Sequence, residues 1–162
     1  MNKSASKLER FRFWSILWGM GLAGQLCWNM ENQWFNTFVY AKISGDVSIV
    51  TWMVIVSAIV TTVSTFFFGT LSDRLGKRKI FVSLGYIIWG FTTIAFGMTE
   101  YAKDSGIGVL VTLSGALVVA TDAVMSFFGS MGNDSGFNVW LNDYTDEHNM
   151  GQIGAALAVS YR

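Results

Sequence analysis

The chain alternates between long apolar runs and short polar links. The runs cover about residues 13–40, 49–71, 80–98 and 108–141, and a fifth run occupies 151–162. A helix needs roughly 20 mainly apolar residues to cross a bilayer, so each of the first four runs predicts a membrane-spanning helix. The fifth run is too short to cross. The pattern predicts an all-α integral membrane protein with four transmembrane helices and a truncated fifth.

Composition supports the membrane interpretation. The sequence is 52% hydrophobic and only 14% charged, and its mean hydropathy is +0.42. Soluble domains carry about 25% charged residues, so this chain could not cover a soluble surface with polar groups. Its formal net charge is zero, which gives no long-range field to attract nucleic acid. The lipid bilayer is therefore an expected partner, and nucleic acid is not.

The basic residues are distributed unevenly between the links. Four precede the first run in the segment 1–12, one lies in the first link, four lie in the second and one lies in the third: Lys3, Lys7, Arg10, Arg12; Lys42; Arg74, Lys77, Arg78, Lys79; Lys103. Short cytoplasmic loops of membrane proteins concentrate Lys and Arg. The alternation predicts a multi-pass protein of the cell membrane with a cytoplasmic N-terminal segment at 1–12 and a transmembrane bundle at 13–162.

The second link has the most specific spacing in the chain. It reads Gly69-Thr-Leu-Ser-Asp-Arg-Leu-Gly-Lys-Arg-Lys79. Gly69 lets a helix end pack closely or adjust its backbone, and Asp73 can accept hydrogen bonds from free backbone amides of a neighbouring helix. Gly76 permits a reversal with positive φ. An ordinary basic loop explains the lysines and arginines but not these three positions.

This link closely resembles the signature between the second and third helices of the major facilitator superfamily, Gly-x-Leu-Ser/Ala-Asp-Arg-x-Gly-Arg/Lys-Arg/Lys. The matching positions are Gly69, Leu71, Ser72, Asp73, Arg74, Gly76, Lys77 and Arg78. The resemblance implies a conformational gate at this turn, in a transporter made of two six-helix halves that alternate access to a central site. The chain would be the N-terminal piece of such a transporter, and the missing C-terminal half would be its partner.

Asp134 is the main candidate for transport chemistry. It lies in Gly129-Ser-Met-Gly-Asn-Asp-Ser-Gly136, beside Asn133, where glycines and polar side chains interrupt an apolar run. A carboxylate at membrane depth is costly unless it faces a wet cavity or a partner. The segment Asp134-Ser-Gly-Phe137 also resembles the fourth helix of the melibiose-type symporters of glycosides, pentosides and hexuronides, which implies contact with sugar or cation. Pairing with a basic residue or amide near the inner interface remains an alternative.

Asp122 is a second acidic candidate. If residues 142–149 are cytoplasmic, counting back about 20 to 25 residues puts the span near 117–141, with Asp122 towards the outer side and Asp134 in the inner half. Twelve residues separate the two by about 18 Å along a helix and about 120° around it, so they should not share one site. A position at the outer mouth or in a helix contact is the alternative for Asp122.

The first run carries a polar stripe. Gln25, Asn29, Asn32 and Asn36 follow i, i+4, i+7, i+11 spacing and form a row about 16 Å long on a regular helix. The row could line a cavity and bind sugar hydroxyls, or it could hold helices together; both interpretations stay open. Glu31 is expected to face away from the stripe, near the outer surface. The hydroxyls of the second run are expected to allow close helix approach without touching substrate: Ser57, Thr61, Ser64 and Thr65.

These patterns predict secondary active transport of a sugar or similar small polar solute, coupled to Na⁺ or H⁺. The alternatives are multidrug-type efflux within the same superfamily and a fragment that does not transport. With one histidine, His148, and one cysteine, Cys27, the chain has no nucleophile–base or metal-ligand constellation. We therefore expect neither an enzyme nor a bound cofactor.

Overall fold

The structure is a computed structural model that describes residues 7–147 and 149–160. The side chains of residues 110–112 and 160 are not described. About 91% of the described residues are helical, and none of them forms a strand. The elements are α1 (Lys7–Asn29), η1 (Met30–Phe35), α2 (Asn36–Phe38), η2 (Val39–Ile43), α3 (Val47–Leu75), α4 (Arg78–Gly97), α5 (Thr99–Asp104), α6 (Gly108–Gly132), η3 (Asn133–Phe137), α7 (Asn138–Tyr144) and α8 (Met150–Ser160). His148, Lys3 and residues 161–162 lie outside the described part.

The predicted all-helical class is confirmed. Among the described residues, three helices are long and apolar enough to cross a membrane: Val47–Leu75, Arg78–Asp104 and Leu113–Tyr144. The segment 7–43 is also long, but it is not one of these three, and Glu31 and the amide stripe interrupt its apolar character. The bundle of four spanning helices and a fifth therefore stays a prediction.

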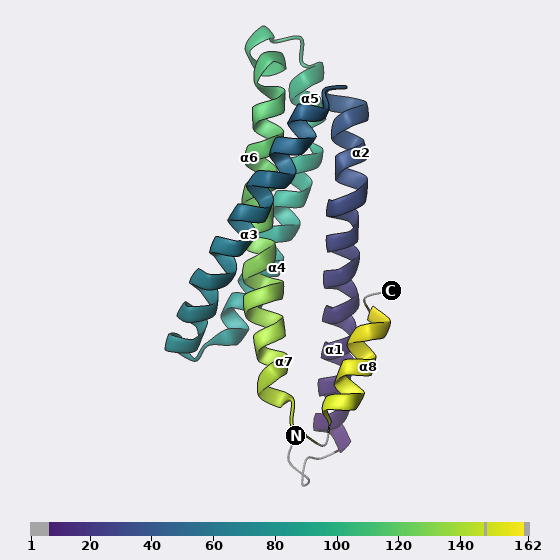
Figure 1. Ribbon diagram of the computed structural model, residues 1–162, viewed down its shortest axis with the longest axis vertical. Coiled ribbons are helices and arrows are strands. Elements are labelled where there is room, and N and C mark those ends of the chain that lie inside the picture. The colour runs from purple at the N-terminus through teal and green to yellow at the C-terminus, as the bar shows by residue number, and fades with distance from the viewer. Residues whose placement is uncertain (1–6, 148, 161–162) are drawn as a thin grey trace.

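Three π-helical stretches interrupt the long helices. η1 and η2 lie in the segment that runs from α1 to the end of η2, which we call the first helical rod. η3 joins α6 to α7. Figure 1 shows both composite segments as continuous rods. A π-helical turn closes with i→i+5 hydrogen bonds, and such turns are frequent at functional sites. Each one rotates the residues beyond it relative to a regular α-helix.

The rod made of α6, η3 and α7 is the central element, because both α3 and α4 pack along it. One hydrophobic cluster joins these helices to η2 and includes Val39, Met53, Trp89 and Met125. A second cluster packs α1 against α7 and α8 through Phe13, Leu17, Leu141, Ile153 and Ala156. Figure 1 shows α8 beside the N-terminal part of α1.

Glycine allows α4 to cross the central rod closely. A Cβ atom at Gly85 would overlap the backbone of Gly132, and one at Gly136 would come within 2.7 Å of Val82 Cγ2. At Gly129 the added atom would lie 2.9 Å from the Trp89 ring. Small residues let membrane helices approach in this way. The glycines around Asp134 therefore have a packing role as well as interrupting the apolar run.

Hydroxyl groups join α3 to the same rod. Ser64 is fully buried and its hydroxyl donates to the Phe127 carbonyl over 2.6 Å. The hydroxyls of Thr65 and Ser130 lie 2.6 Å apart. These contacts fit the expectation that small polar residues of this helix allow close approach. Ser57 and Thr61 have a further position, because they also line a cavity.

Candidate functional site

A cavity of about 330 Å³ lies where the first helical rod, α3 and α6 meet. Its lining mixes apolar, amide, hydroxyl and carboxylate side chains: Trp28, Glu31, Asn32, Asn36, Met53, Val54, Ser57, Ala58, Thr61 and Asp122. Two carboxylates from separate helices thus border one cavity. We call it the carboxylate cavity.

Glu31 is buried in this cavity. Only 7% of its surface is exposed, and its Oε1 accepts a hydrogen bond of 2.7 Å from the Ser126 hydroxyl. The prediction that Glu31 faces away from the amide stripe is therefore wrong, because it shares the cavity with Asn32 and Asn36. It lies within the π-helical turn Met30–Phe35, where the regular 100° per residue assumed for the stripe does not apply.

Asp122 is the second carboxylate of the cavity, and it is 2% exposed. Its Oδ2 forms a hydrogen bond with the Ser57 hydroxyl of α3. Ser126, the partner of Glu31, lies one helical turn beyond Asp122 on α6 and so shares its face. Asp122 and Glu31 are close enough to repel each other electrostatically.

The amide stripe is divided between the cavity and other surroundings. Asn32 and Asn36 line the cavity, and their Nδ2 atoms donate to the carbonyls of Trp28 and Asn32 over 2.8 and 2.7 Å. Gln25 is half-buried and Asn29 is exposed, and neither borders the cavity. Cavity lining therefore applies only to the C-terminal half of the stripe, Asn32 and Asn36.

Asp134 occupies a separate place on η3. It is half-buried and its Oδ1 accepts a 3.2 Å hydrogen bond from the Asn133 amide. Asn133 is buried, and its Oδ1 accepts from the Tyr86 hydroxyl over 3.1 Å. As the twelve-residue spacing predicts, Asp134 does not border the cavity that contains Asp122.

No basic residue lies within the apolar stretches that carry the carboxylates. No Lys or Arg occurs in the stretches 13–41, 43–73, 80–102 and 104–161 of the sequence. Buried carboxylates at membrane depth are rare and usually pair with a cation, a proton or a wet pathway. Among the described residues, neither Glu31 nor Asp122 forms an ion pair with Lys or Arg.

The signature turn forms a charge cluster at the opposite end of α3. Gly76 has φ 61°, which confirms the predicted positive-φ reversal. Arg78 donates to Asp73 Oδ1 over 2.9 Å and to the Val139 carbonyl over 2.9 Å, and it also pairs with Asp143. The partner of Asp73 is thus a side chain rather than backbone amides. Arg74 and Lys77 are exposed, and a Cβ atom at Gly69 would meet nothing within 4 Å.

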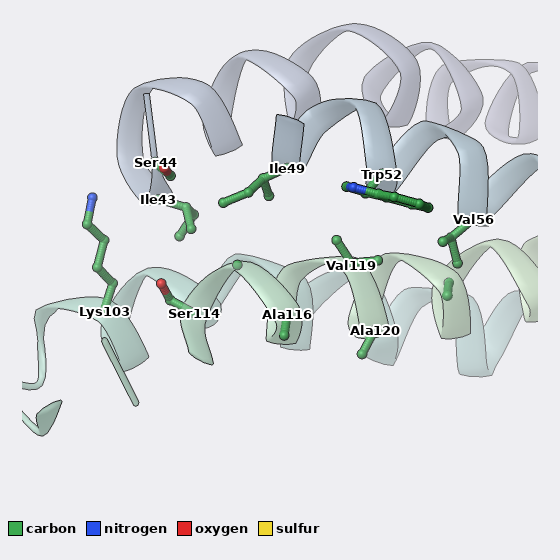
Figure 2. A pocket seen from close by; sticks show the side chains of 12 residues that line it. Ile43, Ser44, Ile49, Trp52, Val56, Lys103, Ser114, Ala116, Val119 and Ala120 are labelled. Carbon is green, nitrogen blue, oxygen red and sulfur yellow. The ribbon is translucent and has the colours of Figure 1, made fainter. Parts of the chain in front are cut away.

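A larger and mostly apolar groove of about 660 Å³ lies between α3 and α6 beyond the carboxylate cavity. Figure 2 shows Lys103 at one end of the groove, with Ile49, Trp52 and Val119 along it. The Lys103 ammonium donates to the Lys42 carbonyl over 2.6 Å. Lys42 in turn pairs with Glu100 at 3.0 Å, and this hydrogen bond raises the pKa of Lys42. None of the candidate site residues from the sequence borders this groove.

Comparison with known proteins adds no relative: no family model, no curated protein and no solved structure matches the chain.

Proposed function

We propose that the chain is part of a secondary active transporter that moves a sugar or similar small polar solute, coupled to a cation, by alternating access. The observation that carries this proposal is the carboxylate cavity. Glu31 and Asp122 are buried among helices of which two are apolar and long enough to cross a membrane. Ionisable groups at such depth typically mark ion or substrate pathways.

The rest of the cavity suits a polar solute. Asn32, Ser57 and Thr61 provide amide and hydroxyl groups, and Trp28 provides an aromatic face, a combination typical of small-molecule sites. Asp134 and Asn133 stay candidates for solute contact on η3. The signature turn, with its Asp73–Arg78 pair, supports a major facilitator bundle in the cell membrane with a cytoplasmic N-terminus.

One observation favours a second function, efflux of amphipathic compounds. The apolar groove between α3 and α6, which has Lys103 at one end, is larger than the carboxylate cavity. It would therefore accept an apolar solute more readily than a sugar. Efflux would not need the two buried carboxylates to face a polar cavity, and for this reason we place it second.

Flux through the full-length transporter in proteoliposomes tests these functions, and the chain alone is measured beside it. Labelled glycosides, pentosides and hexuronides should accumulate under an inward sodium or proton gradient. The variant Asp134→Asn should abolish accumulation, while Asp104→Asn, the same change on an exposed link, should not. Extrusion of a lipophilic dye without sugar uptake would establish efflux instead. Flux of neither solute would indicate a membrane protein that does not transport.

A further inference from the structure

Among the described residues, three buried side-chain oxygens of the carboxylate cavity accept no hydrogen bond within ordinary distance and angle. They are Glu31 Oε2, Asn36 Oδ1 and Asp122 Oδ1, and all three residues line the cavity. Leaving a buried polar atom unsatisfied costs about 1 to 3 kcal/mol, and more if the group is charged. Three such acceptors around one cavity therefore indicate a missing electropositive partner.

Each of these groups is held in place by its other polar atom. Glu31 is bonded to Ser126 through Oε1, and Asp122 is bonded to Ser57 through Oδ2. The amide nitrogen of Asn36 donates to the Asn32 carbonyl over 2.7 Å, which assigns the unpaired atom as the oxygen. Because one polar atom of each group is fixed by a hydrogen bond, the remaining oxygen of each is held in position.

The number and type of free atoms favour a metal ion over a proton. A single proton can be shared by two of these oxygens at most. Hard cations such as Na⁺ and Ca²⁺ bind several carboxylate and amide oxygens at once. Two carboxylates also supply negative charge, and among the described residues neither forms an ion pair with Lys or Arg.

We propose that the carboxylate cavity binds a hard metal cation through Glu31, Asn36 and Asp122. The ion would link the first helical rod to α6, because Glu31 and Asn36 come from the first and Asp122 from the second. Its role as the coupling ion rests on the proposed transport function, whereas its binding does not. Asp134, half-buried and outside the cavity, is not a ligand of this ion.

Direct binding to the full chain in detergent micelles tests the proposal. Equilibrium dialysis with radioactive sodium or calcium should give saturable binding of one ion per chain for at least one of the two metals. The same metal should raise the thermal unfolding temperature in proportion to the logarithm of its concentration. Choline chloride at equal ionic strength is the salt control and should not do so. Absence of binding by both metals would overturn the proposal.

Isosteric variants locate the ion. Glu31→Gln and Asp122→Asn each remove a charged ligand, so each should weaken binding at least about tenfold, the lower end of the effect of losing even an outer partner of a metal site. Asn36→Leu should weaken it less. Asp104→Asn, an exposed carboxylate, is the matched control and should bind as the unmodified chain does. Loss of binding in Asp134→Asn, with binding kept in Glu31→Gln and Asp122→Asn, would place the ion elsewhere and contradict the proposal.

The same measurements separate this inference from the transport function. Metal binding by the chain, together with no solute flux through the full-length protein, supports the site and contradicts transport. A chain that accumulates solute under a proton gradient without binding either metal supports transport and contradicts the site. If Glu31→Gln or Asp122→Asn does not fold, the dialysis of the unmodified chain and the Asn36→Leu variant still decide the result.

Discussion

At the scale of single residues, the buried polar groups of this chain differ in whether all of their oxygen atoms take part in hydrogen bonds. An oxygen without a hydrogen bond can bind an ion or a solute without first losing a partner. Thr65 and Ser130 satisfy each other between α3 and α6, and Asn133 is engaged by Tyr86. Glu31 and Asp122 keep one oxygen each without a donor. The available groups therefore collect in the carboxylate cavity rather than at the polar run around Asp134.

The positive φ of Gly76 leads to the first prediction. Gly76→Ala should destabilise the protein by about 1 kcal/mol, because an L-residue pays roughly that amount in the left-handed region. Gly69→Ala is the matched control in the same helix: the added methyl meets nothing within 4 Å, so it should stabilise the helix by about 0.5 to 1 kcal/mol. Reversible unfolding in mixed micelles with SDS measures both. Equal effects of the two changes would contradict the prediction.

Asp46 provides a pH-dependent prediction at the start of α3. Its carboxylate accepts from the Ser48 amide over 2.9 Å and from the Ser48 hydroxyl, and these bonds hold the pKa of Asp46 below its ordinary value of 3.8. A lowered folded-state pKa stabilises the fold above the unfolded value, and the gain is lost as the pH falls through the folded value. The difference in unfolding temperature between the unmodified chain and Asp46→Asn should therefore shrink below pH 3.8.

The control for this prediction is Asp104→Asn, which removes the same charge from an exposed link without removing a helix cap. Its difference from the unmodified chain should change less over the same pH range. A constant difference for Asp46→Asn down to the acid limit of folding would show that the capping hydrogen bonds do not distinguish the charged form.

At the scale of elements, close backbone contact fixes how α4 lies on the central rod. Gly85, Gly129 and Gly136 leave no room for a side chain at that crossing. Between α3 and α6, hydrogen bonds of hydroxyl groups hold the two helices together. Because α6 is held on both sides, the carboxylate of Asp122 and the hydroxyl of Ser126 are kept on the face that meets Glu31.

Gly85→Ala tests the crossing of α4 and α6. The new methyl would overlap the Gly132 backbone, and overpacking of this kind typically costs about 1 to 3 kcal/mol. Gly90→Ala lies on the same helix with nothing within 4 Å of the added atom, so it should be neutral or slightly stabilising. Unfolding in mixed micelles measures the pair. A tolerated Gly85→Ala would mean that α4 does not cross α6 at this point.

At the scale of the whole molecule, the first helical rod is joined to the remainder at two levels. Near the chain ends α1 packs with α8 and α7, and further along η2 packs with Met53 and Phe96. Between these levels lies the carboxylate cavity, to which the rod supplies Trp28, Glu31, Asn32 and Asn36. Figure 1 shows this rod beside the group of α3, α4 and α6. A bound ion would therefore act across the interface between the rod and this group.

The proposed orientation gives a prediction at this scale. In a Cys27→Ser background, Asp104→Cys should react with a membrane-impermeant maleimide on intact cells, because α5 (Thr99–Asp104) would lie on the outer side of the membrane. Lys77→Cys should react only after permeabilisation, since basic links stay in the cytoplasm. Both positions are exposed, so accessibility within the protein does not limit either reaction. The reverse pattern would contradict a cytoplasmic N-terminus.

The sequence by itself determined the all-helical class, the apolar helices and the reversal at Gly76. Apolar runs at bilayer length, a polar link between Lys42 and Ser48, and a glycine among charges act locally, so their consequences follow without knowledge of the neighbours. The same local reasoning separated Asp122 from Asp134, because twelve residues along one helix set both a distance and a rotation.

Tertiary structure alone decided which polar groups meet. The amide stripe assumes a regular helix, but the π-helical turn at Met30–Phe35 changes the rotation per residue, and Glu31 enters the cavity with Asn32 and Asn36. Its meeting with Asp122 also needs the packing of α3 and α6, which depends on contacts such as Ser64 with Phe127. Contacts between residues far apart in the chain depend on helix rotation and crossing, and neither is encoded in the period of a single run.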